Sequence, residues 1–258
     1  MIRETWCKSA LTISKLPGIE YSLNPYVGCQ HACVYCYVPS VMHLKRDEWG
    51  KTVHAKVNIP SVLQKEIKKR SRGIVGISTS TDAYQPAEKS YELTRKCLTV
   101  LARHDWPVDI LTKSDMVLRD IDILTRFSDV RVGFTIPTLN DKSRRLLEPH
   151  APSIERRLSA LRECGENGLR TYVFCGPLFP DVEKEGVKNC VDVFIDAGAE
   201  EIIIDSFHLK RGIWESMASV IPDEEKMIFE ERIRGAVKLF SEFERHCRGR
   251  ITLTRAFA

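Results

Sequence analysis

An alternation of strand-like and helix-like patterns constrains the fold of this chain more than any other feature. Apolar runs rich in β-branched residues are each followed by a polar turn and then by a helical pattern. The expected strands are Ser22–Val27, Gly73–Ser78, Val108–Thr112, Arg131–Ile136, Arg170–Gly176 and Glu201–Asp205. Repeated βα units of this kind predict an α/β protein with a parallel sheet and helices outside it.

The predicted helices between these strands each carry apolar residues on one face. They span Ser61–Lys69, Glu88–Arg103, Ile121–Phe127, Ile154–Gly165 and Val187–Gly198. A last amphipathic helix is expected over Pro222–Cys247, because Pro-Asp-Glu-Glu makes a favourable first turn, and the final ITLT is a candidate strand.

Residues whose side chains could bind a ligand or catalyse a reaction fall just past the predicted strand ends. This placement favours a curved, partial (β/α)6 barrel of the TIM type over a flat sheet. No linker divides the chain. We therefore predict one domain over residues 1–258, with a core of about 20–215 and a C-terminal extension of about 222–258.

The composition narrows the class of protein. No apolar run approaches the ~18 residues that suggest a membrane span, and the first residues lack the apolar segment of a signal peptide. We expect a cytoplasmic protein with reduced thiols and no membrane partner. The net charge of +4 permits a polyanionic partner without requiring one.

Three of the nine cysteines, Cys29, Cys33 and Cys36, lie within eight residues directly after the first predicted strand. Thiolates are the usual ligands of a [4Fe–4S] cluster. With three of them, one iron keeps an open position, which is typical of catalysis or substrate binding. Two alternatives stay open: a zinc site with His31 as a strained fourth ligand, or three structural cysteines.

The motif CxxxCxxC, with an aromatic residue before its last cysteine, resembles the signature of the radical S-adenosylmethionine (SAM) superfamily. The resemblance extends over most of the chain to the spore photoproduct lyase branch, in the segments CVYCYVP, STSTDAYQPAEKSYELTR, ILTKSDMVLRDIDIL, VGFTIPTLND, RRLLEPHAPSIERRLSAL and CGPLFPD. It implies a lyase-like enzyme whose cluster cleaves SAM reductively. The resulting 5′-deoxyadenosyl radical then abstracts hydrogen from a substrate.

The resemblance also implies roles for residues around the cluster. Tyr35 and Tyr37 would flank the cluster, close to the adenine and the substrate, and Tyr37 is a candidate catalytic residue. Thr81 and Asp82 would meet the methionine amino group, because a carboxylate and an ammonium make a strong charge-assisted bond. Asp82 as the N-cap of a following helix is the simpler alternative.

Four further residues of the same pattern would complete the SAM site. Lys113 would face the methionine carboxylate or the ribose, and Thr135 would hydrogen-bond the ribose. Arg157 would serve the carboxylate, and Gly176 would let the adenine approach the backbone closely. A solvated loop lysine and a plain strand end are the alternatives for Lys113 and Thr135.

Thr79 stands where spore photoproduct lyases have a cysteine that returns hydrogen to the product radical. A threonine O–H bond is far stronger than an S–H bond, so we expect poor repair of thymine dimers. Cys175, at the end of a predicted strand, is the candidate substitute donor, with a place in the apolar core as the alternative.

The substrate class follows from the resemblance rather than from the residues. A nucleic acid is the expected substrate and partner, and a peptide or a small molecule is the alternative. A non-catalytic iron–sulfur or zinc module that binds nucleic acid is a third hypothesis. A reducing partner such as ferredoxin or flavodoxin is implied, while the sequence leaves the oligomeric state open.

Overall fold

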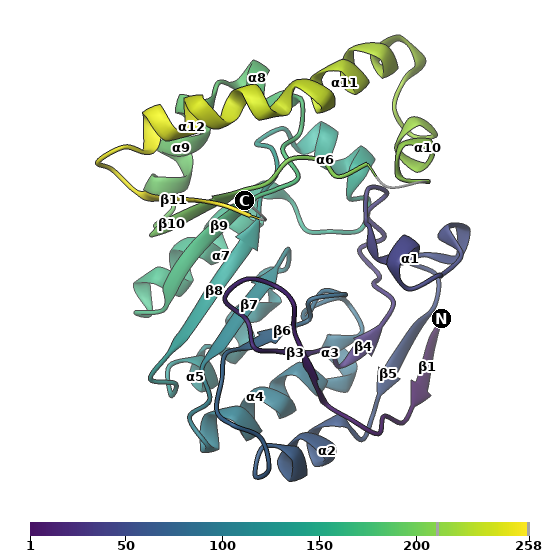
Figure 1. The fold of residues 1–258 in the computed structure, drawn as a ribbon, viewed down its shortest axis with the longest axis vertical. Coiled ribbons are helices and arrows are strands. Elements are labelled where there is room, and N and C mark those ends of the chain that lie inside the picture. The colour runs from purple at the N-terminus through teal and green to yellow at the C-terminus, as the bar shows by residue number, and fades with distance from the viewer. Residues whose placement is uncertain (210–211, 257–258) are drawn as a thin grey trace.

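The computed structural model describes residues 1–209 and 212–256, and a curved sheet of eight strands lies at its centre (Figure 1). The strand order is β11-β10-β9-β8-β7-β6-β3-β2. All neighbours in this sheet pair in parallel except β2 and β3, which are antiparallel. The strands are β2 (Leu11–Ile13), β3 (Tyr21–Leu23), β6 (Val75–Ile77), β7 (Val108–Thr112), β8 (Val130–Thr135), β9 (Arg170–Cys175), β10 (Glu201–Ile204) and β11 (Thr252–Arg255).

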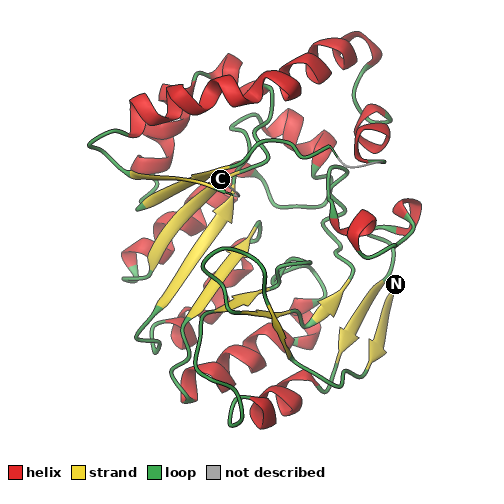
Figure 2. Cartoon of the chain, viewed as in Figure 1, coloured by secondary structure: helices red, strands yellow, loops and turns green. Residues whose placement is uncertain are grey.

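Helices cover the outer face of the sheet and leave its concave face toward the cysteine loop (Figures 1 and 2). The predicted partial barrel with outer helices is therefore confirmed. The apolar core lies between the two layers, where Phe134 of β8 and Phe194 of α9 are fully buried. The helices before the C-terminal extension are α1 (Val38–Val41), α2 (Ile59–Glu66), α3 (Glu88–Tyr91), α4 (Leu93–Arg103), α5 (Ile121–Leu124), α6 (Asp141–Leu147), α7 (Ile154–Glu166), α8 (Asp181–Glu185), α9 (Val187–Asp196) and α10 (Ile213–Ala218), with 3₁₀ turns η1 (Arg46–Glu48) and η2 (Asp115–Asp120).

A second, three-stranded sheet was not predicted. It has the order β1-β5-β4, from β1 (Ile2–Thr5), β5 (Val53–Lys56) and β4 (Tyr26–Val27). The single strand expected over Ser22–Val27 is therefore wrong. The chain leaves the main sheet after Leu23, turns at Asn24 and Pro25, and pairs with β5 instead. The cysteine loop thus starts from the small sheet.

The helix expected over Glu88–Arg103 is also divided in two. Glu92 adopts a left-handed conformation with φ of 52° between α3 and α4. The side chain of Glu88 explains the break, because its carboxylate accepts the backbone N–H groups of Thr94 and Arg95 at 3.0 and 3.1 Å. These first-turn donors have no partner within their own helix.

The C-terminal extension contains two helices where one was expected. It runs through α11 (Asp223–Gly235), a 3₁₀ turn η3 (Ala236–Lys238) and α12 (Leu239–Cys247) into β11, which confirms the predicted last strand. Residues 257–258 of the predicted extension lie outside the described residues. Within 1–209 and 212–256, no helix is both long and apolar enough to span a lipid bilayer.

Polar side chains fill the barrel at the amino ends of its strands. The Tyr172 hydroxyl donates to Asp109 at 2.7 Å, and the Arg131 guanidinium lies over the Tyr172 ring, 4.6 Å from its centroid. Arg131 also pairs with Asp109 at 2.7 Å and with Glu201 at 2.9 Å. A side chain at Gly133 would begin 2.1 Å from the Tyr172 ring, so only glycine fits there.

Candidate active site

The cysteine loop begins with a tight turn that requires glycine. Gly28 has φ of +87°, and a Cβ at this position would lie 2.5 Å from the Thr52 carbonyl oxygen. Short backbone hydrogen bonds then fold the loop, including Cys36 N–H to the Cys33 carbonyl at 3.1 Å. Cys29 and Cys33 are buried and Cys36 is half-buried.

The three loop cysteines are free thiols in a dry environment. Burial, followed by the facing Asp82 carboxylate, raises the pKa of Cys29 to about 12. Burial likewise raises the pKa of Cys33 well above its ordinary value and raises the pKa of Cys36. Binding of a metal cluster must therefore displace protons from thiols that are otherwise neutral.

The segment after α6 clamps the cysteine loop from one side. The Val34 N–H donates to the Leu147 carbonyl at 3.0 Å, and the His150 N–H donates to the His31 carbonyl at 3.4 Å. Between these two backbone contacts, the Tyr35 hydroxyl donates to the Glu148 carboxylate. Tyr35, predicted to flank the cluster, is thus held in place by a residue far away in the sequence.

Glu148 is a site residue that the sequence did not reveal. Its side chain is fully buried, and Arg157 binds it at 2.5 Å. Burial raises the pKa of Glu148, but Arg157 and Lys113 outweigh burial and hold the pKa below its ordinary value. The carboxylate is therefore ionised and stands between the cysteine loop and two cations.

Lys113 lies at the carboxyl end of β7, where the sequence placed it, and its ammonium reaches the site. Its Nζ is 3.8 Å from Glu148 Oε1 and 5.8 Å from the Tyr35 ring centroid. The first distance suits an ion pair but is too long for a hydrogen bond. Burial lowers the pKa of Lys113, yet Cys33 and Glu148 raise it above its ordinary value. The charged Lys113 ammonium thus keeps N–H donors for a ligand. Its burial differs from the alternative of a lysine in a solvated loop.

Asp82 lies at the same edge of the sheet and organises the surrounding loops. Its carboxylate accepts from the Thr112 hydroxyl at 2.6 Å and from the backbone N–H groups of Tyr84 and Lys113 at 2.9 and 2.8 Å. The next helix begins only at Glu88, so Asp82 is not its N-cap. Burial raises the pKa of Asp82, but His31 and these hydrogen bonds hold it well below its ordinary range.

One contact of the Asp82 carboxylate is poorly aligned. His31 Nδ1 lies 3.3 Å from Asp82 Oδ2 without hydrogen-bond geometry. Nearby, the buried hydroxyls of Ser78 and Thr81 make no hydrogen bond to any residue that the structure describes. Buried polar groups are normally satisfied, so these atoms fit a polar ligand. Three free thiols, an ammonium and unpaired hydroxyls together fit the expected cluster and SAM.

Tyr37 and Thr79 meet beside this polar group. The Tyr37 hydroxyl donates to the Thr79 carbonyl at 3.2 Å, and Asn24 donates to the Thr79 hydroxyl at 3.3 Å. A cavity of about 200 Å³ opens there. Its lining includes Ile13, Lys15, Tyr37, Val41, Met42 and Thr79. Tyr37, Val41 and Met42 are exposed hydrophobic residues next to the last loop cysteine.

Arg157 is buried among groups of the protein, and its predicted contact with the SAM carboxylate stays a prediction. Its guanidinium is fully buried and donates to the Thr135 carbonyl at 2.8 Å and to the Pro152 carbonyl at 3.0 Å, besides pairing with Glu148. Through Glu148, which also faces Lys113, the Arg157 guanidinium is linked to the proposed SAM site. Thr135 lies at the end of β8 and is buried.

Gly176 follows β9 in a crowded place. A Cβ at this position would lie 2.6 Å from the Phe174 ring and 2.9 Å from the Asp205 Cβ. Side chains of the protein itself thus lie close to the Gly176 backbone. The contact between Gly176 and the adenine stays a prediction.

Cys175 faces away from this site. It is fully buried in the apolar core, where the groups that raise its pKa after burial itself are Cys190, Glu185 and Cys247. Cys190 and Cys247 belong to the outer helices α9 and α12. The catalytic role suggested for Cys175 is therefore not supported, and the core alternative fits its position.

Two glutamines tie the cysteine loop to the Asp82 segment. The Gln30 N–H donates to the Gln85 side chain at 2.9 Å, and Gln85 donates to the Gly28 carbonyl at 3.1 Å. The Ala87 N–H completes the link by donating to the Gln30 side chain at 2.6 Å.

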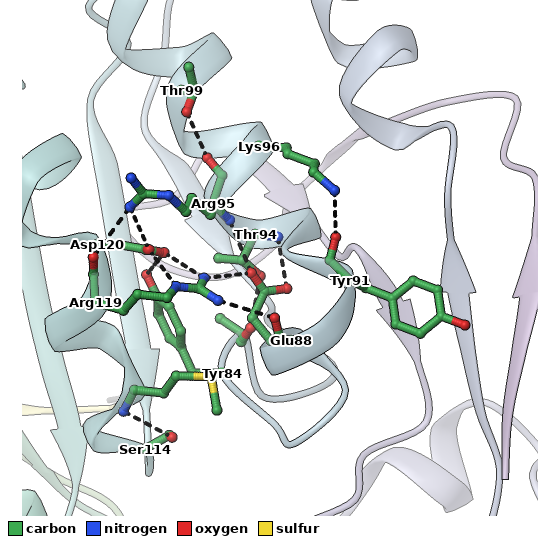
Figure 3. A network of polar contacts seen from close by, with 12 residues as sticks. Tyr84, Glu88, Tyr91, Thr94, Arg95, Lys96, Thr99, Ser114, Arg119 and Asp120 are labelled. Atoms are coloured by element: carbon green, nitrogen blue, oxygen red, sulfur yellow. Dashed lines mark hydrogen bonds and ion pairs between the residues drawn. The ribbon is translucent and has the colours of Figure 1, made fainter.

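A second buried network lies behind this link (Figure 3). Arg119 bridges Glu88 at 2.9 Å and Asp120 at 2.7 Å. Arg95 also pairs with Asp120 at 2.9 Å, and Tyr84 donates to Asp120 at 3.2 Å. The network anchors the segment that carries Asp82 onto α4 and η2.

Among the described residues, no group of three or more His, Cys, Asp or Glu side chains could hold one metal ion. That geometry concerns a single ion. Each thiolate of a [4Fe–4S] cluster binds a different iron, so its ligands do not converge on one point.

Comparisons with known proteins bear on the family and the fold. The sequence model of the radical SAM superfamily matches residues 23–193. An uncharacterized protein of Methanocaldococcus jannaschii is 38% identical over 176 residues, which cover 68% of this chain and 66% of that protein. This chain thus spans slightly less than two thirds of that relative.

Solved structures give the same fold. Spore photoproduct lyase complexed with dinucleoside spore photoproduct has a TM-score of 0.68 at 16% identity, covering 98% of this chain and 81% of the lyase. Streptococcus suis SuiB bound to precursor peptide SuiA has a TM-score of 0.59 at 14% identity, covering 93% of this chain and 49% of SuiB.

Proposed function

Because the chain belongs to the radical SAM superfamily, whose enzymes use a [4Fe–4S] cluster and SAM, we propose that it starts radical chemistry on a nucleic-acid substrate. When bound, these cofactors supply a 5′-deoxyadenosyl radical that abstracts hydrogen. Membership of an enzyme family removes the non-catalytic module from the alternatives. A peptide or small-molecule substrate remains the rival hypothesis.

In this proposal, Cys29, Cys33 and Cys36 hold the cluster, and two charged residues orient SAM. The Lys113 ammonium binds the methionine carboxylate, because it keeps donors beyond its 3.8 Å contact with Glu148. Asp82 Oδ2 receives the methionine ammonium on the side where His31 is poorly aligned.

Hydroxyl and glycine contacts complete the proposed SAM site. The unpaired Thr81 hydroxyl assists at the amino group, and Thr135 bonds the ribose. Gly176 lies beside the adenine. Tyr35 lies against the cluster, where Glu148 holds its hydroxyl.

The observation that carries the substrate proposal is the cavity of about 200 Å³ beside Tyr37. Its wall combines the Tyr37 ring with apolar Ile13 and Met42, and Lys15 lies at its lining. An aromatic ring stacks on a flat base, and a lysine suits a phosphate. A base with its phosphate fits that combination better than an extended peptide.

Thr79 also lines this cavity, which bears on the outcome of the reaction. Its hydroxyl is engaged by Asn24 and is a poor hydrogen-atom donor. We propose that the product differs from that of a lyase that returns hydrogen from a cysteine at this position. A ferredoxin- or flavodoxin-like protein is the proposed source of electrons.

The test follows hydrogen from substrate to SAM product. Anaerobically reconstituted protein is incubated with dithionite, SAM and deuterium-labelled cell fractions, either nucleic acid or peptide. We expect deuterium in 5′-deoxyadenosine from the nucleic-acid fraction. Label that arrives only from the peptide fraction rejects the proposal in favour of its rival. Cys33→Ala is the matched control and should form no 5′-deoxyadenosine.

A further inference from the structure

Arg46 contacts the cysteine loop from the side of η1. Its guanidinium donates to the Val34 carbonyl at 3.2 Å and to the Cys36 carbonyl at 3.0 Å, and it also donates to the Ser40 hydroxyl at 3.0 Å. One carbonyl belongs to the last loop cysteine itself, and the other lies two residues before it. A planar guanidinium is suited to such a fork of contacts and stays charged.

The charge of Arg46 is held against the loop itself. The Cys36 carbonyl that accepts from Arg46 at 3.0 Å belongs to the same residue as the sulfur, so this hydrogen bond fixes the guanidinium beside a proposed cluster ligand. Arg46 and a thiolate at Cys36 would therefore attract each other electrostatically.

We propose that Arg46 is a positioning residue that raises the reduction potential of the [4Fe–4S] cluster. An external reductant adds one electron and converts the cluster from the 2+ to the 1+ state. A fixed positive charge favours the more negative, reduced state. The guanidinium also binds the carbonyl oxygens of Val34 and Cys36, whose partial negative charge would oppose the added electron. Net charge and hydrogen bonding are the levers that set such potentials.

This role is separate from SAM binding. Among the described residues, Arg46 donates hydrogen bonds to Val34, Cys36 and Ser40, none of which is proposed to bind SAM. Lys113 is also a cation beside the cysteine loop, but it belongs to the proposed SAM site. The effect of Arg46 is thus present before SAM or substrate binds, and it holds whatever the substrate is.

The experiment is a potentiometric titration of reconstituted protein with dithionite, without SAM or substrate. The electron paramagnetic resonance signal of the reduced cluster gives the reduced fraction, after iron and sulfide contents are matched. At the wild-type midpoint, Arg46→Gln should show an about tenfold smaller ratio of reduced to oxidised cluster, which is ~59 mV for a one-electron couple. Arg46→Lys keeps the charge and should stay within about twofold to threefold of wild type.

Arg126→Gln is the matched control, because this exposed arginine pairs with Asp122, four residues earlier in the chain. It should leave the midpoint unchanged. A wild-type midpoint in cluster-loaded Arg46→Gln would overturn the proposal, as would equal falls in the Gln and Lys variants, which would show that shape and not charge matters.

If Arg46→Gln takes up no cluster, Arg46→His decides the question. Its imidazole is charged at pH 5.5 and neutral at pH 8.5. The midpoint of this variant should fall between these two pH values by more than that of wild type. Parallel pH dependence of the two proteins would overturn the proposal.

Discussion

Two buried ionic networks support the candidate site, and they differ in how completely they are paired. In the network of Figure 3, Arg119 binds Glu88 and Asp120 at 2.9 and 2.7 Å, and Arg95 adds a further contact to Asp120 at 2.9 Å. In the other network, Arg157 binds Glu148 at 2.5 Å while Lys113 stays 3.8 Å away.

We interpret the difference as one between support and ligand binding. The closed network satisfies its own charges and fixes the segment that carries Asp82. The open network keeps one cation short of hydrogen-bonding distance, which leaves a place for the SAM carboxylate in the proposed site. Burial alone therefore does not mark a binding residue, because both networks are buried.

The largest expected effect is on the closed network. Arg119→Met leaves Glu88 and Asp120 without their bridging cation, and we expect the free energy of unfolding to fall by about 3 kcal/mol. Chemical denaturation of the protein without cofactors measures this. SAM affinity of the cluster-loaded protein should stay within about twofold. A large loss of SAM affinity would remove the distinction between the networks.

Lys113→Met should show the reverse pattern. The loss of a charge-assisted bond to the SAM carboxylate should weaken SAM binding by about tenfold to hundredfold. The free energy of unfolding should change by less than about 1 kcal/mol, because no short contact is lost. Calorimetric titration with SAM measures the affinity, and Lys142→Met, at an exposed position of α6, is the control. Unchanged SAM affinity contradicts the role given to Lys113.

Glu148 makes the stability of the protein depend on acid pH. Its pKa is depressed in the folded state. Its contribution to stability is thus present above the unfolded pKa, near 4.5, and is lost as the pH falls through the lower folded pKa. Glu148→Gln should be less stable than wild type at pH 7, with a gap that narrows below pH ~4.5. Thermal unfolding from pH 7 to 3 measures the gap, and a constant gap speaks against ionised Glu148.

The smallest effect is expected outside both networks, at Cys175. Cys175→Ala removes a small buried side chain and should lower the free energy of unfolding by about 1 kcal/mol. The rate of 5′-deoxyadenosine formation should match wild type. A clear change in that rate, at equal cluster content, would return Cys175 to the active site.

The strand–helix alternation and the strand ends could be predicted because they depend on local patterns. Asp82 and Lys113 meet because parallel strands bring their carboxyl ends to one edge. The face of β9 on which each side chain lies could also be predicted. Because side chains alternate along a strand, Cys175 lies on the face of Val173, opposite Tyr172 and Phe174. A thiol at a strand end is therefore placed by this alternation, and here it lies on the core side.

Other features had no local signal. Glu148 follows a short helix rather than a strand, and two of its partners, Tyr35 and Lys113, are distant in sequence. The small sheet joins strands of two to four residues from separate parts of the chain. Arg46 lies in a polar loop whose orientation only the folded backbone defines. In each case the information is a tertiary contact, and no periodicity encodes it.

The Tyr172 ring that occupies the space above Gly133 has a kinetic consequence. Because Tyr172, Asp109 and Arg131 fill the amino ends of the strands, we expect reactants to enter from the carboxyl ends. A nucleic acid bound at the carboxyl ends of the strands would cover SAM beneath it. Binding should then follow a compulsory order, with SAM entering first and leaving last.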